Sequence, residues 1–392
     1  ALAIEADVTF TGKAVDDQSG FPVESAGDVN GDGFADILIG AQFADPGGQT
    51  SAGESYLIYG SASLSSTISL AAADVTFTGK TDFDFSGQSV STAGDVNNDG
   101  YDDILIGAYG AGPSAGDTYL IYGNSSLTGV IDLTNADVTF TGDGSLAYSG
   151  FSVSAAGDVN GDGFDDILIG AYGMTLSSGE TYLIYGGDSL AADFPLSGAH
   201  VTFTGIQSSD YSGFSVSNAG DVNGDGFDDI LIGALSANPN GLSSGDSYLI
   251  YGAVNLTATI SLFLADVTFS GTAAGDFSGY SVSTAEDVNG DGFDDILIGA
   301  PEAAPNGTYS GTSYLIYGGT SLPMDFELTS SDAIFNGNAV GERVGRAVSN
   351  AGDVNGDGFA DIIVGGYLAS GATGTSAGAS YLFYGSGERP AR

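Results

Sequence analysis

Residues 158–166 read Asp-Val-Asn-Gly-Asp-Gly-Phe-Asp-Asp, and versions of this nine-residue stretch occur six times in the chain. We call it the acidic loop and number its positions 1 to 9. The copies span 28–36, 95–103, 158–166, 221–229, 287–295 and 353–361. Oxygen-bearing side chains recur at positions 1, 3, 5 and 9, and position 6 is always glycine, which tolerates the positive φ of a sharp reversal. This alternation is typical of a cation site, since Ca²⁺ takes about six to eight oxygen ligands at about 2.3–2.6 Å.

The pattern predicts four side-chain ligands in each loop. They are Asp28, Asn30, Asp32 and Asp36; Asp95, Asn97, Asp99 and Asp103; Asp158, Asn160, Asp162 and Asp166; Asp221, Asn223, Asp225 and Asp229; Asp287, Asn289, Asp291 and Asp295; and Asp353, Asn355, Asp357 and Asp361. An ordinary solvated turn is the alternative, but three carboxylates in one turn repel one another unless a cation neutralises them. An EF-hand would need a carboxylate at position 12. Here position 12 is apolar, inside runs such as DILIGA that predict a buried strand.

The composition restricts the partners. The chain has 392 residues, no cysteine, and fifty Asp and Glu against six Lys and Arg, for a formal charge of −44. Six bound Ca²⁺ would leave −32, so nucleic acid and anionic membranes are excluded as partners on electrostatic grounds. Because the chain cannot form disulfides, bound metal is the candidate for stabilising the fold in their place. No apolar run reaches membrane-spanning length. The chain opens without Met or a signal peptide, as a processed extracellular segment would, and loops of this kind fit a calcium-rich exterior.

The acidic loop belongs to a larger repeat. Successive copies begin 63 to 67 residues apart, and each repeat reads ADVTFTG, a turn ending in SG, a strand such as FSVSAAG, the acidic loop, DILIGA, a variable loop and YLIYG. Four strands per repeat predict an all-β fold: a six-bladed β-propeller of four-stranded antiparallel blades, forming one domain over residues 1–392. The chain starts with an unassigned VTFTG strand at 8–12 and lacks one at its end. We therefore expect this N-terminal strand to pair into the last blade and close the ring.

Two further patterns concern the core and the ligand face. A phenylalanine recurs in each VTFTG strand and two tyrosines in each YLIYG strand, and we assign them to the core.

All variation in repeat length falls between the second and third strands, on the face opposite the acidic loops. Such loops commonly carry binding residues, although they are equally consistent with simple lack of constraint.

Arg346 is the candidate ligand-binding residue. It stands where the other repeats have Phe, Gln or Tyr, near turn residues that are acidic in five repeats. The acidic turn residues are Asp17, Asp84, Asp210, Asp276 and Glu342, and we expect them at the mouth of the ring's channel. Arg346 either pairs with Glu342 or Asp276, or binds an anionic ligand group such as a uronate or carboxylate.

These motifs resemble the FG-GAP repeat family, which builds the N-terminal β-propeller of integrin α chains and parts of many bacterial surface proteins. The aromatic and glycine of its name appear as Phe85-Ser86-Gly87, and Gly-Ala-Pro appears once, at 299–301. The acidic loop matches the family's calcium site. The resemblance implies about six Ca²⁺ per chain and a fifth ligand, the position-7 carbonyl of Phe34, Tyr101, Phe164, Phe227, Phe293 and Phe359.

This chain differs from the integrin pattern, in which the propeller has seven blades and only some of the blades carry an acidic loop. It also has no inserted adhesion domain, so integrin ligand specificity does not carry over. The nearly uniform repeats look like a bacterial array.

We therefore expect a calcium-stabilised, extracellular or cell-surface module without catalytic activity, a monomeric ring that binds a protein or glycan. One alternative is the propeller domain of a secreted polysaccharide-active enzyme, and another is a purely structural spacer of a large surface protein. The sequence disfavours catalysis, because general acid–base chemistry draws on side chains such as His and Lys, and the chain has one histidine, His200, and two lysines.

Overall fold

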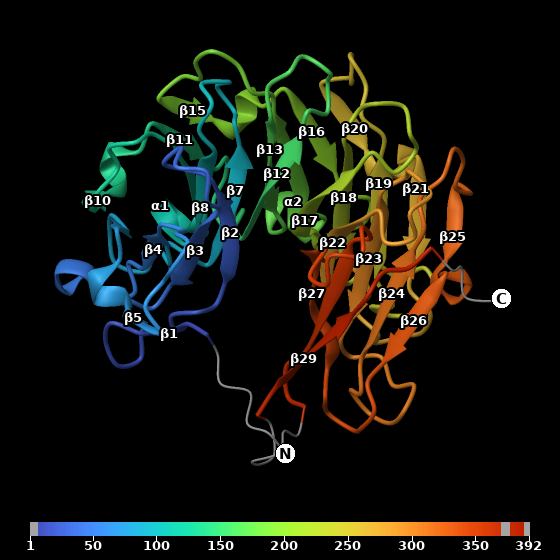
Figure 1. Ribbon diagram of the computed structural model, residues 1–392. Helices are drawn as coiled ribbons and strands as arrows, with labels where there is room; N and C mark the ends of the chain where they lie inside the picture. Colours follow the sequence, from blue (N-terminus) through green and yellow to red (C-terminus); the bar gives the residue numbers. More distant parts are fainter. Residues whose placement is uncertain (1–6, 370–376, 388–392) are drawn as a thin grey trace. The chain divides into compact units, whose positions relative to one another are not determined.

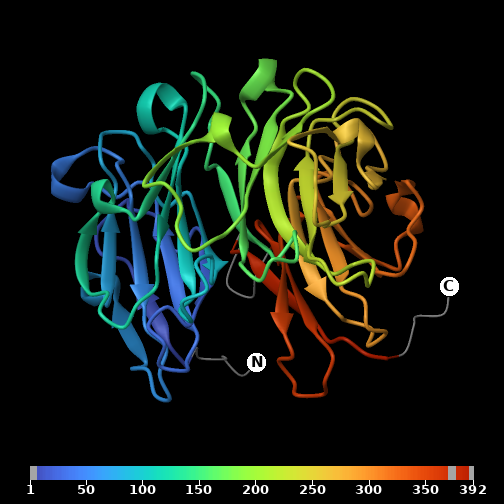
Figure 2. The ribbon, with the colours of Figure 1, turned by 90° about the horizontal axis from the view of Figure 1, so that it is seen from above.

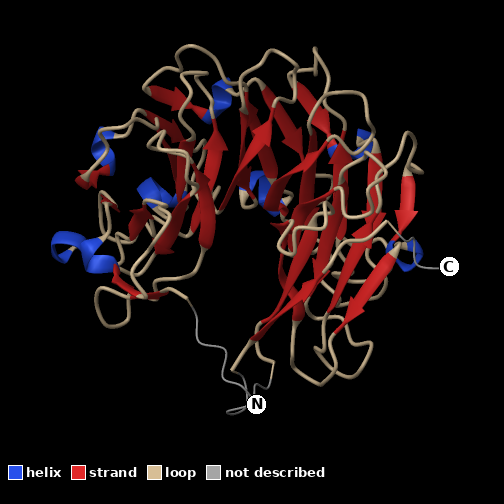
Figure 3. Cartoon of the chain, viewed as in Figure 1, coloured by secondary structure: helices blue, strands red, loops and turns tan. Residues whose placement is uncertain are grey.

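The computed structural model describes residues 7–369 and 377–387, and its regular secondary structure consists mostly of short β-strands joined by loops and turns (Figure 1; Figure 3). By contacts the chain divides into two compact units. The first comprises Ala1–Ala155, Phe164–Ile169 and Tyr185–Ala199, and the second Ala156–Gly163, Gly170–Ile184 and His200–Arg392. Among the described residues, no helix is long and apolar enough to cross a membrane.

Each of the first five repeats forms a blade-like sheet from four strands in sequence order. The first sheet contains β2 (Val23–Gly27), β3 (Asp36–Ala41), β4 (Glu54–Ile58) and β6 (Val75–Thr78), and the second contains β7 (Ser89–Gly94), β8 (Asp103–Ala108), β9 (Asp117–Ile121) and β11 (Val138–Thr141). Neighbouring strands within these two sheets are antiparallel. The acidic loop joins the first and second strands of each repeat, as predicted.

The third, fourth and fifth repeats contain the same four strands, and the sixth contains the first three of them. The third has β12 (Ser152–Gly157), β13 (Asp166–Ala171), β14 (Glu180–Ile184) and β16 (Val201–Thr204); the fourth has β17 (Ser212–Gly220), β18 (Asp229–Ala234), β19 (Asp246–Ile250) and β21 (Val267–Ser270). The fifth has β22 (Ser281–Glu286), β23 (Asp295–Ala300), β24 (Thr312–Ile316) and β26 (Ala333–Asn336), and the sixth has β27 (Val344–Gly352), β28 (Asp361–Gly366) and β29 (Ala379–Phe383). In the second unit the sheets of repeats four to six lie side by side (Figure 2). The all-β, six-bladed class is confirmed.

A fifth strand was not predicted. The short strands β5 (Thr67–Ser69), β10 (Gly129–Asp132), β15 (Asp193–Pro195), β20 (Thr259–Ser261) and β25 (Asp325–Glu327) each pair in parallel with the VTFT-type strand that precedes the repeat they come from. Each is followed by a 3₁₀ turn whose first residue is a buried leucine. These turns are η2 (Leu70–Ala72), η3 (Leu133–Asn135), η4 (Leu196–Gly198), η5 (Leu262–Leu264) and η6 (Leu328–Ser330). The other short helices, η1 (Pro46–Gly48), α1 (Ala111–Ser114) and α2 (Met174–Ser177), lie in the variable loops.

The N-terminal strand differs from its prediction. β1 (Thr9–Thr11) pairs in parallel with β5, and the last sheet contains three strands in the order β27-β28-β29. The predicted fourth strand of the last blade, residues 8–12, is therefore placed beside β5 instead. The unpredicted fifth strand supplies β1 with a row of backbone hydrogen bonds along its outer edge, as its counterparts do for β6, β11, β16 and β21, which also keep an antiparallel partner on the other edge.

Most of the recurring aromatics form the core, as predicted, although Tyr384 is 62% exposed. Phe77, Phe140, Phe203 and Phe269 are fully buried, as are Tyr56 and Tyr119. In the first unit, for example, Phe77 packs with Ile104, Ile106 and Leu133. Aromatic side chains of this size supply much of the apolar area that a sheet interface buries.

Adjacent repeats are joined through their acidic loops. The position-8 N–H of one repeat donates to the position-1 carbonyl of the preceding repeat, as in Asp102 to Asp28 at 3.2 Å. The position-8 carboxylate accepts the position-1 N–H in return, and we call this second bond the aspartate clasp. The clasps are Asp102 to Asp28 (2.6 Å), Asp165 to Asp95 (2.8 Å), Asp228 to Asp158 (2.8 Å) and Asp294 to Asp221 (2.9 Å).

The clasp explains the glycine that precedes most loops. A Cβ at Gly94 would lie 2.2 Å from an Asp165 carboxylate oxygen, and Gly27, Gly157 and Gly220 are equally close to their clasp aspartates. Where position 8 of the following repeat is Ala360, the preceding residue is Glu286 rather than glycine, and it still adopts a positive φ of 55°. The glycine therefore makes room for the neighbour's carboxylate as well as for the turn.

Gly94→Ala should destabilise the protein more than Gly352→Ala. Both glycines have positive φ, so each substitution carries a conformational cost of about 1 kcal/mol or more. Only Gly94 has a clasp to displace, because no atom lies within 4 Å of a Cβ built at Gly352. Loss of the clasp should cost about 1–3 kcal/mol more. Urea denaturation in calcium would measure the difference, and equal losses would contradict the clasp.

Candidate metal centres

The six acidic loops share one backbone conformation. Position-6 glycines have φ between 88° and 90°, from Gly33 to Gly358, as the sequence predicted. Position 4 is also in the left-handed region, at 73–75° for its glycines and 56° for Asn98. Four of the position-4 glycines also receive the position-7 aromatic ring of the next repeat; a Cβ at Gly161 would lie 2.5 Å from Phe227. Sequence reasoning missed this second role of the two motif positions.

The first three predicted ligands of each loop fold around the same turn. In the first loop, Asp28 Oδ1 accepts the N–H of Asp32 at 3.0 Å and Oδ2 accepts that of Gly33 at 2.8 Å. Asn30 Oδ1 also accepts the N–H of Asp32, and Asp32 Oδ1 accepts that of Phe34. The position-1 bonds recur in the other five loops. The carboxylate and amide oxygens of the loop thus accept several backbone N–H bonds within one tight turn.

The position-9 aspartates are buried at the base of the loops. Asp103 Oδ2 accepts the N–H of Val96 at 3.0 Å, inside its own loop, while Oδ1 accepts that of Gly123 at 2.8 Å, in the connection after the third strand. The second bond is repeated by Asp36, Asp166, Asp229, Asp295 and Asp361. These bonds confirm that the acidic loop and this connection share one end of each sheet.

Burial disfavours the ionised form of four position-9 carboxylates. It raises the pKa of Asp36 to about 6 and those of Asp103, Asp229 and Asp295 to about 8. Backbone donors oppose this rise, whereas the aspartates at positions 1 and 5 of the same loop reinforce it. A desolvated carboxylate beside two others favours either a proton or a cation.

The loops supply a calcium-type donor set of three carboxylates, one amide oxygen and the position-7 carbonyl. Within residues 7–369 and 377–387, however, no group of three or more His, Cys, Asp or Glu side chains is already gathered to hold a metal ion. Several of these oxygens accept backbone N–H bonds instead. The residue types fit calcium, and ion binding would require the carboxylates to turn towards a common centre.

The acidic turn residues have a different role from the one predicted. They are buried and cap their own turns: Asp84 Oδ2 accepts the N–H of Thr81 at 2.7 Å, and Asp276 Oδ2 accepts that of Ala273 at 2.9 Å. Asp17, Asp210 and Glu342 make the equivalent bond. Because each side chain is buried and one of its oxygens caps its own turn, these residues do not present an exposed acidic ring.

Arg346 lies between two aromatic rings. Its guanidinium carbon is 4.9 Å from the centre of the Tyr280 ring and 4.8 Å from that of Tyr367. None of the ion pairs between described residues includes it, and its buried Nε has no hydrogen-bond partner. The predicted pairing with Glu342 or Asp276 is therefore not formed. His200, the one histidine, is exposed.

The comparisons with known proteins agree on the repeat. The profile of the FG-GAP repeat matches residues 23–58, 86–122, 149–185, 212–250, 278–316 and 344–383. The chain is 28% identical to integrin alpha-5 of Xenopus laevis over 240 residues, covering 56% of this chain and 20% of that protein. It is 31% identical to integrin alpha pat-2 of Caenorhabditis elegans over 228 residues, 54% of this chain and 17% of that protein.

A third relative carries an enzyme's name. Phosphatidylinositol-glycan-specific phospholipase D of Dictyostelium discoideum is 28% identical over 224 residues, 53% of this chain and 23% of that protein. The matches therefore span about a fifth of the length of these relatives. Among solved structures, the WD40 domain of Toxoplasma gondii coronin gives a TM-score of 0.48 at 10% identity, over 93% of this chain and 68% of that one.

Without calcium, the protein should lose stability as the pH rises from 5 to 8. The folded pKa of Asp103, about 8, exceeds the unfolded value of about 3.9. The stability from its proton is fully present below the unfolded pKa and is lost as the pH rises through the folded pKa. Thermal unfolding in EDTA would show the fall, and Asp103→Asn should make it shallower. An unchanged slope in that variant would contradict the assignment.

Proposed function

The chain belongs to the FG-GAP repeat family, and we propose that it is a calcium-stabilised binding module without catalytic activity that works outside the cell. One observation carries the proposal: six loops of the same conformation each combine three carboxylates, an amide and a carbonyl, with one carboxylate buried at the base. Within each loop, positions 1, 3, 5 and 9 and the position-7 carbonyl would hold the ion. Bound calcium would neutralise the loop carboxylates, and weak extracellular sites match the exterior's calcium concentration.

The position-9 aspartate links ion binding to the fold. Through Gly123 and its counterparts, this carboxylate connects the loop to the connection after the third strand. The clasp then connects position 1 of one loop to the neighbouring repeat. Ion binding at one loop would therefore stiffen its own sheet and its contact with the next repeat.

The ligand of the module is proposed to be a protein or glycan with an anionic group, bound at Arg346 on the side of the repeat away from the acidic loops. The two tyrosine rings fix the guanidinium, and its freedom from ion pairs leaves it available for bidentate pairing with a carboxylate. Arg346→Ala should abolish binding in a glycan and matrix-protein array, whereas Arg346→Lys should weaken it. Full binding by the alanine variant would contradict this site.

An attached enzyme is the second candidate function, because one relative is named a phospholipase. The present chain would then be its non-catalytic propeller segment. Hydrolysis by the purified chain, tested on phosphatidylinositol-glycan substrates, would overturn the non-catalytic proposal.

Chelation should lower the melting temperature by tens of degrees. Each filled site adds about 2.7 kcal/mol when free calcium is a hundredfold above its Kd, so six sites would dominate stability. Thermal unfolding in EDTA and in excess calcium would measure the shift, and calorimetric titration the number of sites. An unchanged melting curve in EDTA would contradict the calcium proposal.

Two neighbouring aspartates provide the matched control. Asp166→Ala removes a proposed ligand and should reduce the calcium stoichiometry by one. Asp165→Ala removes the clasp to Asp95 but no proposed ligand, and it should lower stability with and without calcium while leaving the stoichiometry unchanged. Equal loss of sites in both variants would show that position 8 is also a ligand.

A further inference from the structure

A second acidic position recurs at the start of the third strand, away from the acidic loops. It is Glu54 in the first repeat, Asp117 in the second, Glu180 in the third and Asp246 in the fourth, and a core tyrosine follows two residues later. The capped turn that precedes the first strand lies beside it, since Asp84 acts on Tyr119 and Asp210 on Tyr248 electrostatically. The same local arrangement is thus present in several repeats with different side chains.

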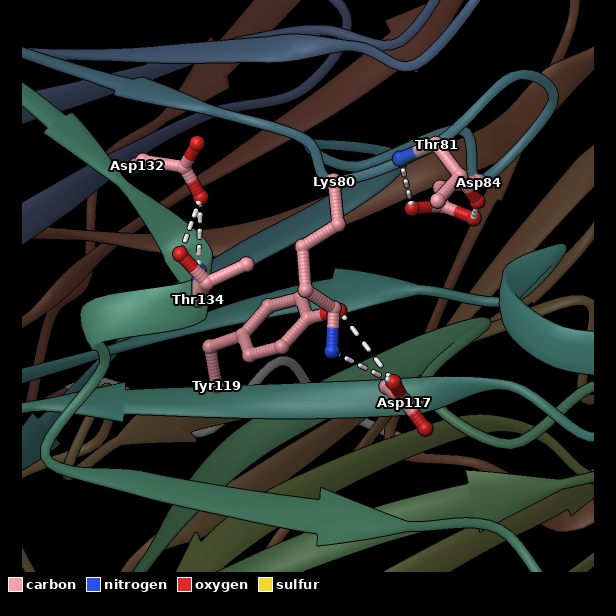
Figure 4. Close-up of polar contacts among 7 residues, drawn as sticks. All are labelled: Lys80, Thr81, Asp84, Asp117, Tyr119, Asp132 and Thr134. Atoms are coloured by element: carbon pink, nitrogen blue, oxygen red, sulfur yellow. Dashed lines mark hydrogen bonds and ion pairs between the residues drawn. The ribbon is translucent and has the colours of Figure 1, made fainter.

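In the first two repeats the ammonium group of a lysine binds the acidic side chain at this position. Lys13 Nζ lies 2.7 and 2.8 Å from the two carboxylate oxygens of Glu54, which is itself buried. Lys80 Nζ lies 3.0 Å from Asp117 Oδ2 and 4.7 Å from the centre of the Tyr119 ring. Figure 4 shows Lys80 reaching along Tyr119 to Asp117, with Asp84 and Asp132 nearby. The arrangement therefore accommodates a primary ammonium group with both a carboxylate and an aromatic face.

The fourth repeat keeps the acids but has no lysine. Ile206 occupies the position of Lys13 and Lys80, directly after the glycine that ends the VTFTG strand, and is 40% exposed. Asp210 is 1% and Asp246 8% exposed, and the Oδ1 atom of each is buried without a hydrogen-bond partner. None of the ion pairs between described residues includes either aspartate.

These two oxygens are an energetic anomaly. A buried acceptor without a donor costs about 1–3 kcal/mol, and more when it is charged. Burial, reinforced by the Asp210 carboxylate, raises the pKa of Asp246 to about 7, although hydrogen bonds from the Ser270 and Tyr248 hydroxyls oppose the rise. Glu327 adds a third negative charge nearby, although its Oε2 accepts a bond from Asn240. In the first two repeats, by contrast, the ammonium group of Lys13 or Lys80 donates to the corresponding carboxylate.

We propose that Asp210, Asp246 and Tyr248 in the fourth repeat form a binding site for the primary ammonium group of a ligand. The ammonium would donate to the two unpartnered Oδ1 atoms and lie against the Tyr248 ring, as Lys80 lies against Tyr119. Because both oxygens are buried, the group must arrive on a narrow alkyl stem, as it does in the lysines. Lysine side chains and small alkylamines share this chemistry.

This site is a ligand site for the binding module proposed above, but it does not depend on calcium ligation, since it shares no residue with the acidic loops. Calcium-dependent melting should therefore be retained in variants of Asp246 and Ile206. Loss of amine binding with intact calcium dependence would be a failure of the ammonium site alone, and the reverse would be a failure of the calcium proposal alone.

The test is a calorimetric titration of the calcium-loaded chain with n-butylammonium chloride, using tetramethylammonium chloride as the control because it carries the charge without N–H donors. We expect one site for n-butylammonium. Ile206→Lys should abolish this binding and raise the melting temperature, because the new lysine would occupy the site as Lys80 does. Asp246→Asn should weaken binding about tenfold or more. Lys80→Ala should create a second site in the second repeat.

A Gly-Lys-Gly peptide distinguishes the two sources of the group. Tighter binding than n-butylammonium would identify a lysine-bearing partner segment, and weaker binding a small amine. No binding of either probe by the wild-type chain would overturn the proposal. So would binding that survives Ile206→Lys, or equal competition by tetramethylammonium or potassium, which would indicate a site for cations in general.

Discussion

The bond pair of the position-9 aspartate is the interaction on which each repeat depends. One carboxylate oxygen accepts an N–H from the acidic loop and the other an N–H from the connection after the third strand, as Asp103 does with Val96 and Gly123. The loop is thereby attached to the connection after the third strand, which is distant from it in sequence. Because the group is buried, its charge state influences the loop, the sheet and any bound ion together.

Burial also separates the acidic residues into distinct roles. Fifty acids in one chain look interchangeable in composition, yet Asp84 caps a turn, Asp102 joins two repeats and Asp103 anchors a loop. Each role is defined by the backbone donors available to the carboxylate rather than by its distance from other acids. This is why residues adjacent in sequence, such as Asp102 and Asp103, should respond differently to ion binding.

The sequence predicted the repeat, the strands and the conformation of the acidic loop, because glycine and aspartate act there through local backbone geometry. It did not predict the short parallel strands such as β5 and β10, which are three or four residues long and satisfied only by a partner from another repeat. It also misplaced the acidic turn residues, since spacing alone cannot show that Asp276 turns inward to its own backbone. The aspartate clasp was not predicted for a similar reason. The sequence did hold one signal: the glycine before the loop is replaced, by Glu286, where position 8 of the next repeat is Ala360.

The parallel fifth strand has a consequence for how the chain folds during synthesis. β6 of the first repeat gains its outer partner only when β10 is made, and β10 belongs to the connection that follows the third strand of the second repeat. The sheets of the first four repeats are all incomplete when their own four strands have emerged from the ribosome, because their outer strands β10, β15, β20 and β25 come from the next repeat. Each of these four repeats must wait with an open edge for the next one, so the order of translation becomes an order of assembly, and a pause within one repeat leaves its predecessor unfinished.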